Sequence, residues 1–130
     1  LIASPSHPLA QAGRISLKDV AKEGIIVRGQ GSANRRTAEG EFESLECSPS
    51  ITLEQGSNQA VKQAAAAGGG IGVISRLGIT AEIKAGMLVA LDVEGWDCRR
   101  PLTLVYPKNR YLSSAQRAFR GYLLSQIPKV

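Results

Sequence analysis

Apolar and polar residues alternate in short blocks along the chain, and these blocks predict strands and helices in turn. Residues 25–27 and 71–74 are apolar runs rich in β-branched side chains, a composition typical of buried strands. Residues 88–93 form the longest strand candidate. The full set of predicted strands is 1–3, 25–27, 51–55, 71–74, 88–93 and 102–105.

Helix signals lie between these strands. Ser16 and Asp19, like Ser113 and Gln116, have the spacing of residues that cap a helix start, and Ser57 is a third candidate cap. Helices are therefore expected after these three serines and at residues 33–45 and 76–85. The predicted core-facing positions are Leu17, Val20, Ala21, Ala38, Phe42, Leu45, Ala60, Val61, Ala64, Ala65, Ile79, Ile83, Ala118, Phe119, Tyr122 and Leu123.

This alternation of strands and helices predicts an α/β fold with a mixed, mostly parallel sheet flanked by helices. Two prolines exclude regular structure from residues 4–8, and Gly86 is a candidate helix end. Residues 68–70 are three glycines that follow a helix and lead into a strand, the reverse of a dinucleotide fingerprint. They are expected to allow close packing of helix and strand.

Two polar turns share one design, in which a strand runs through Gly-Ser into a helix. They are residues 27–32 and 53–58. A helix start offers free N–H groups and a partial positive charge, which suit a carboxylate or phosphate. Two such starts along one sheet edge would make an anion site. The alternative is that Ser32 and Ser57 only cap their helices.

Composition limits the remaining function classes. The 130 residues carry a net charge of +5, but the basic residues are dispersed and lack interleaved aromatics, which disfavours nucleic-acid contact. Cys47 and Cys98 match no disulfide framework or metal motif, and the single histidine, His7, excludes a histidine-based metal site or triad. We expect no cofactor, metal, catalytic site or membrane span, and a reduced, cytoplasmic setting.

Several short motifs follow one another along the chain: His7-Pro8-Leu9-Ala10, Ile15-Ser16-Leu17-x-Asp19-Val20, Ile26-Val27-Arg28-x-x-Gly31-Ser32, Gly56-Ser57-Asn58-x-x-Val61-Lys62, Ala67-Gly68-x-Gly70-Ile71-Gly72-Val73-Ile74-Ser75, Gly86-x-Leu88-Val89 and Leu112-Ser113-x-Ala115-x-x-Ala118-Phe119. Their order and spacing resemble the effector-binding domain of LysR-type transcriptional regulators, most closely those of the Calvin-cycle type and their sulfur-metabolism relatives. At the turn after the second strand, Ala33 and Asn34 depart from the family's usual Gly-Thr.

The resemblance implies a periplasmic-binding-protein-like fold of type 2, with two lobes joined by crossover strands and an effector in the cleft between them. Residues 1–9 would form a crossover, 10–90 the second lobe, and 91–130 the return crossover with part of the first lobe. A small, anionic effector would contact Arg28, Gln30, Gly31, Ser32, Arg35, Gln55, Ser57 and Asn58.

The resemblance further implies homodimers or larger oligomers, with DNA bound only through an N-terminal winged helix-turn-helix absent from this sequence. With half of one lobe missing, residues 102–127 are expected to expose apolar surface and to drive self-association. Two rivals share the scaffold: a transporter's solute-binding protein and an enzyme. The first needs an export signal and the second a catalytic base, and neither is visible.

Overall fold

The computed structural model describes residues 1–127. The chain divides into two compact units, Leu1–Arg100 and a second that begins at Pro101. Each unit is described by itself.

The first unit is built on a five-stranded sheet of order β4-β3-β5-β1-β6. Its strands are β1 (Ile2–Ala3), β3 (Ile25–Arg28), β4 (Ile51–Gln55), β5 (Ile71–Gly72) and β6 (Val89–Ala90). Strand β3 is parallel to β4 and β5, whereas β1 is antiparallel to β5 and β6. A second, parallel pair joins β2 (Arg14–Ile15) to β7 (Asp92–Val93). Three of the five pairings are therefore parallel, and the predicted mixed, mostly parallel α/β fold is confirmed.

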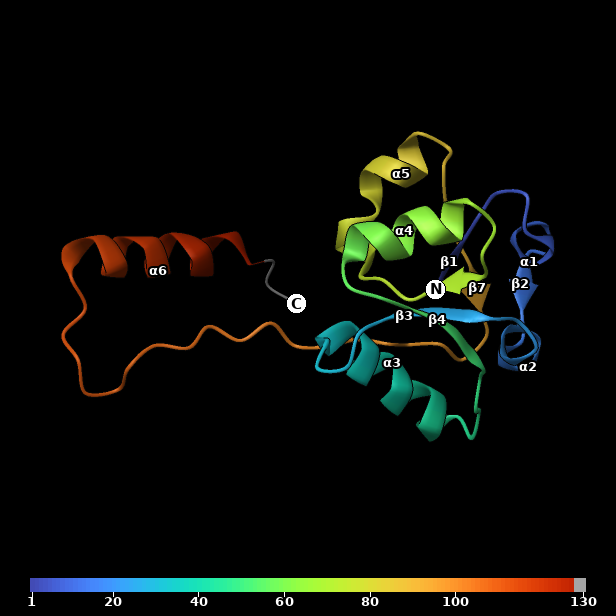
Figure 1. Cartoon of the computed structure of the whole chain (residues 1–130). Helices are drawn as coiled ribbons and strands as arrows, with labels where there is room; N and C mark the ends of the chain where they lie inside the picture. Colours follow the sequence, from blue (N-terminus) through green and yellow to red (C-terminus); the bar gives the residue numbers. More distant parts are fainter. Residues whose placement is uncertain (128–130) are drawn as a thin grey trace. The chain divides into compact units, whose positions relative to one another are not determined.

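Helices cover both faces of the larger sheet, with α4 and α3 on opposite sides of β3 (Figure 1). The helices of the first unit are α1 (Pro8–Gln11), α2 (Leu17–Ala21), α3 (Ala33–Ser44), α4 (Asn58–Ala66) and α5 (Thr80–Lys84), with a 3-10 turn at Arg76–Gly78; α6 (Ser114–Gln126) belongs to the second unit. Side chains that alternate along β3 enter two cores. Ile25 and Val27 pack with Phe42 of α3, while Ile26 packs with Val61 of α4.

The glycine run ends α4 and lets the start of β5 lie close to the start of β3. Gly68, at a φ of 83°, ends α4 in the left-handed conformation, and its N–H donates to the Ala65 carbonyl. A Cβ placed on Gly70 would lie 2.3 Å from the carbonyl oxygen of Gly24, closer than any side chain allows. This contact brings the start of β5 against the start of β3.

Two strand predictions are wrong. Residues 88–93 do not form one strand, because the chain pairs with β1 at Val89–Ala90 and then changes sheets to pair with β2 at Asp92–Val93. Strand β4, with five residues, is the longest instead. Residues 102–105 form no strand, since no other strand in the described part of the chain offers its backbone a hydrogen-bonded partner.

Two helix predictions and one loop prediction also need correction. The predicted helix 76–85 is a 3-10 turn followed by α5, which buries Ile79 but leaves Ile83 39% exposed. Leu45 is 38% exposed because α3 ends at Ser44 and the chain then turns back at Glu46. Pro8 begins α1 rather than excluding structure, since the first helical position needs no N–H donor, and the His7 ring accepts from the Leu9 N–H at 3.2 Å.

The second unit holds α6, with the predicted capping box at Ser113 and Gln116. None of its helical residues is buried, and Phe119 and Tyr122 are 63% and 62% exposed. The expected apolar exposure is therefore present, although it places Phe119 and Tyr122 on a surface and not in a core.

Candidate functional site

The two polar turns lie side by side at one sheet edge. Strands β3 and β4 are parallel and in register, so that Arg28 at the end of one pairs with Gln55 at the end of the other. The Gly29 N–H donates to the Gln55 carbonyl at 3.0 Å, which continues the pairing into the turns. Helices α3 and α4 start directly after these turns, and the sequence prediction of two helix starts along one edge is confirmed.

The two cap serines are used differently. The Ser57 hydroxyl accepts from the Ala60 N–H at 3.0 Å, so this side chain caps α4. Ser32 has the extended backbone of a cap residue, but within residues 1–127 its hydroxyl makes no cap hydrogen bond. Gly31, at a φ of 87°, supplies the turn that brings Ser32 to this position. The Ser57 oxygen therefore accepts a cap bond and the Ser32 oxygen does not, while the O–H group of each serine can still donate to a ligand.

Arg28 connects the two turns. Its Nη1 donates to Asn58 Oδ1 at 2.8 Å, which joins the end of β3 to the first residue of α4. Its Nε is buried and has no hydrogen-bond acceptor among the described residues. A buried cationic N–H without an acceptor is costly, and an anion would satisfy it once the side chain moved enough to expose this atom.

Arg35, in the first turn of α3, is surrounded by acceptors. Its Nε donates to Glu39 at 2.7 Å, and its Nη1 donates to Glu54 and, at 3.3 Å, to the carbonyl of Arg28. The hydrogen bonds to Glu39 and Glu54 raise the pKa of Arg35 above its ordinary value. These bonds fix the guanidinium between α3 and the ends of both strands.

The remaining predicted residues lie beside the α3 start. Gln30 and Gly31 line a hollow of about 240 Å³ together with Arg35, Arg36 and Glu39. Arg36, which was not predicted, donates from Nη1 to the Gly31 carbonyl at 2.8 Å. Glu39 and Glu54 were also not predicted as site residues. The i, i+4 spacing of Arg35 and Glu39 could have indicated the first pair, whereas no sequence signal connects Arg35 to Glu54.

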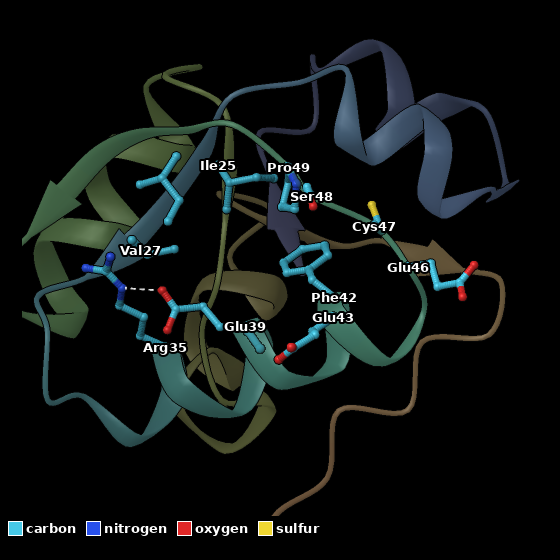
Figure 2. Close-up of a pocket in the computed structure, with 12 residues that line it drawn as sticks. Ile25, Val27, Arg35, Glu39, Phe42, Glu43, Glu46, Cys47, Ser48 and Pro49 are labelled. Atoms are coloured by element: carbon cyan, nitrogen blue, oxygen red, sulfur yellow. Dashed lines mark hydrogen bonds and ion pairs between the residues drawn. The ribbon is translucent and has the colours of Figure 1, made fainter.

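A larger groove of about 470 Å³ lies beside α3, shares Arg35 and Glu39 with the smaller hollow, and is shown in Figure 2. Its floor is apolar and includes Val27 and Phe42. Glu39, Glu43 and Glu46 add carboxylates to its lining. This negative lining disfavours an anion, so size alone does not mark the groove as the anion site.

Other chemistry is not assembled in the described part of the chain. Residues 1–127 hold no group of three or more His, Cys, Asp or Glu side chains placed to bind a metal ion. Cys47 and Cys98 are free thiols, and burial, followed by the charge of Glu41, raises the pKa of the Cys98 thiol. None of the helices within 1–127 has the length and apolar character that crossing a membrane requires.

Curated relatives of this chain are transcriptional regulators. It is 38% identical over 130 residues to the RuBisCO operon transcriptional regulator of Allochromatium vinosum, covering 100% of this chain and 43% of the relative. It is 34% identical over 125 residues to the HTH-type transcriptional activator CmpR of Synechocystis, covering 96% and 41%. The chain thus spans less than half the length of these relatives. The predicted similarity to Calvin-cycle-type regulators is confirmed.

Solved structures of regulatory and effector-binding domains also resemble this chain. The CcmR regulatory domain of Synechocystis PCC6803, in complex with 2-PG, matches with a TM-score of 0.82 and 31% identity, covering 95% of this chain and 60% of that one. The effector-binding domain of QuiR, in complex with shikimate, matches with a TM-score of 0.76 at 22% identity and supports the fold alone. The sequence pattern of the LysR substrate binding domain matches residues 1–128. The chain belongs to the LysR substrate-binding domain family.

Proposed function

We propose that this chain is the effector-sensing domain of a transcriptional regulator and binds a small anion where α3 and α4 begin. The observation that carries the proposal is the pairing of Arg28 with Gln55, which sets two helix starts side by side around a buried, unsatisfied Arg28 Nε. This arrangement concentrates donors and positive potential at one point.

The donors have distinct roles. The first N–H groups of α3 and α4 have no partner within their own helices and suit oxyanion oxygens. Arg28 supplies the charge, and the Ser32 hydroxyl and the Gln30, Gln55 and Asn58 amides supply adjustable hydrogen bonds. Gly31 permits close backbone approach, and Ser57 contributes by capping and orienting α4. Arg35, with its bonds to Glu39 and Glu54, completes the predicted set.

The formal charge of the site favours an anion. Three arginines, Arg28, Arg35 and Arg36, face two carboxylates, Glu39 and Glu54, which leaves a surplus of one positive charge. The CcmR regulatory domain, 31% identical, is in complex with 2-PG. We therefore choose 2-PG as the test ligand and propose a small anionic metabolite as the effector.

The proposal extends to the whole protein. The regulator would act in the cytoplasm, bind DNA through a helix-turn-helix outside residues 1–130, and assemble as a dimer or larger oligomer. Residues 1–9 and the start of 91–130 would be the two crossovers, 10–90 the second lobe, and the rest of 91–130 part of the first. The domain would sense rather than catalyse. Ligand binding would shift DNA binding by favouring one of two arrangements of the lobes or subunits.

The relatives do not favour the rival interpretation as a transporter's solute-binding protein, since the two described above regulate transcription. Membership of the LysR substrate-binding domain family likewise favours a transcriptional regulator over a solute-binding protein. A two-lobe scaffold is shared by both classes, so the fold by itself does not separate them.

The proposal is tested by titrating the chain with 2-PG in a calorimeter. Ser32→Ala is expected to weaken binding by about fivefold, the loss of one neutral hydrogen bond, and Arg28→Gln by tenfold or more, about 1.4 kcal/mol. Arg14→Gln is the control, because Arg14 is an exposed arginine in the separate two-stranded sheet. Equal affinity in all four proteins would refute the assigned site, and heat absent in wild type would refute 2-PG as its ligand.

A further inference from the structure

Arg35 is the most heavily engaged side chain at the two turns. It stands at the third position of α3, and its side chain is only 11% exposed. Its three observed acceptors come from three different segments: the Arg28 carbonyl at the end of β3, Glu54 in β4, and Glu39 one helical turn further along α3. Figure 2 shows the guanidinium directed at Glu39.

This engagement differs from that of a ligand-binding arginine. An arginine that binds an oxyanion presents its fork of N–H groups to the ligand. In Arg35, Nε and both hydrogens of Nη1 are taken by protein oxygens, which uses three of its five N–H groups and leaves only the Nη2 pair. In Arg28, by contrast, Nε has no acceptor. The two arginines at the site therefore have different tasks.

Glu54 explains why a second arginine is needed. The carboxylate lies immediately before Gln55 and close to the first turn, since a Cβ on Gly29 would be 3.5 Å from Glu54 Oε1. An uncompensated carboxylate at the base of an anion site repels the anion. Arg35 compensates this charge and, through the Arg28 carbonyl, holds the end of β3 against α3.

We propose that Arg35 is a positioning residue that tunes the anion site through Glu54 and does not touch the effector. The inference rests on the proposed function for its effect on binding, and on the ion pair alone for its effect on the turns. Losing Arg35 should therefore weaken effector binding, and removing the charge of Glu54 as well should restore most of the lost affinity.

The first test is a double-mutant cycle with 2-PG as the probe. Arg35→Ala is expected to weaken binding about tenfold, and Arg35→Ala with Glu54→Gln to return within about threefold of wild type, as expected when an unpaired charge and not a lost contact causes the defect. Arg28→Gln with Glu54→Gln is the matched control and should remain well below wild type. A double variant as weak as Arg35→Ala alone overturns the proposal.

The second test needs no ligand and separates this inference from the proposed function. Amide hydrogen exchange is measured at Gly29 and Ser32, whose N–H groups donate to the Gln55 and Gly29 carbonyls. Arg35→Ala should speed exchange at both amides by about tenfold or more and leave Ile26, in the sheet centre, unchanged. Unchanged exchange at Gly29 and Ser32 overturns the positioning role, even if wild-type protein fails to bind 2-PG.

Discussion

Gly70→Ala is expected to lower the free energy of unfolding of the first unit strongly, because it would block the close approach of residue 70 to the Gly24 carbonyl. A Cβ at residue 70 would lie 2.3 Å from the Gly24 carbonyl oxygen and 3.2 Å from its carbon. The same oxygen accepts from the Ile71 N–H at 2.9 Å, so the Gly24 carbonyl cannot move away without breaking the first bond between β3 and β5. Residue 70 also has a φ of 131°, a region that only glycine adopts readily.

The size of the destabilisation follows from the strained φ of residue 70 and from its contact with Gly24. Holding alanine at this φ costs on the order of 1–3 kcal/mol, and relieving an overpacked contact by shifting backbone costs about 1–3 kcal/mol more. The sum, about 4 kcal/mol, approaches the total stability of about 5–15 kcal/mol that a small domain has. Gly70→Ala should therefore be poorly folded or unfold at a much lower urea concentration.

The assay is urea unfolding followed by far-ultraviolet circular dichroism, with Gly40→Ala as the control. Gly40 lies within α3, and an added Cβ there meets nothing within 4 Å. Gly40→Ala should stabilise the protein by about 0.5–1 kcal/mol, because alanine loses less backbone freedom in a helix. A Gly70→Ala protein within 1 kcal/mol of wild type, by the same extrapolation, would refute the close-approach argument.

Three further predictions test other parts of the fold. Glu46→Gly should raise the free energy of unfolding by about 1 kcal/mol, because Glu46 holds a left-handed φ of 52°; a lower urea midpoint would contradict this. The hydrogen bond from Lys62 lowers the pKa of Glu82, so its stabilisation is complete above a pH of about 4.3 and lost as the pH falls through the lowered pKa. In Glu82→Gln, the urea midpoint should fall less than in wild type as the pH is lowered; an unchanged pH profile would show that the pair contributes nothing. Exposed Phe119 and Tyr122 should make the chain self-associate in concentration-dependent light scattering, and replacing both with glutamine should reduce this; a strict monomer at all concentrations would contradict the exposure argument.

The central strands and the long helices could be predicted because their sequences carry complete periods. Ile25 and Val27 enter one core and Ile26 the other, as expected of an apolar run buried on both faces. Strand β2 was not predicted, and β7 was predicted only as the end of a single strand 88–93, since two residues show no periodicity and a pairing between residues 14 and 92 is invisible locally. The same reason explains the false strand at 102–105, where a strand-like sequence has no partner among the described residues.

The candidate site could be predicted only in outline. The repeated strand–Gly-Ser–helix design located both turns, and the parallel register of β3 and β4 brought them together. The sequence marked both Ser32 and Ser57 as candidate caps, and could not show that only the Ser57 oxygen accepts a cap hydrogen bond. Nor could it show that Arg35 is paired with Glu54, because that contact joins residues 19 positions apart on different elements.

The central claim, that an anion binds where α3 and α4 begin, is tested most directly by nuclear magnetic resonance of the amides during a 2-PG titration. We expect the largest, saturable shifts on the first amides of the two helices, residues 33–35 and 58–59, and on the Arg28 Nε–H, because the Ala60 N–H is already bonded to Ser57. Shifts concentrated instead along the α3 groove, around Glu43 and Cys47, or no saturable shift at either helix start, would contradict it.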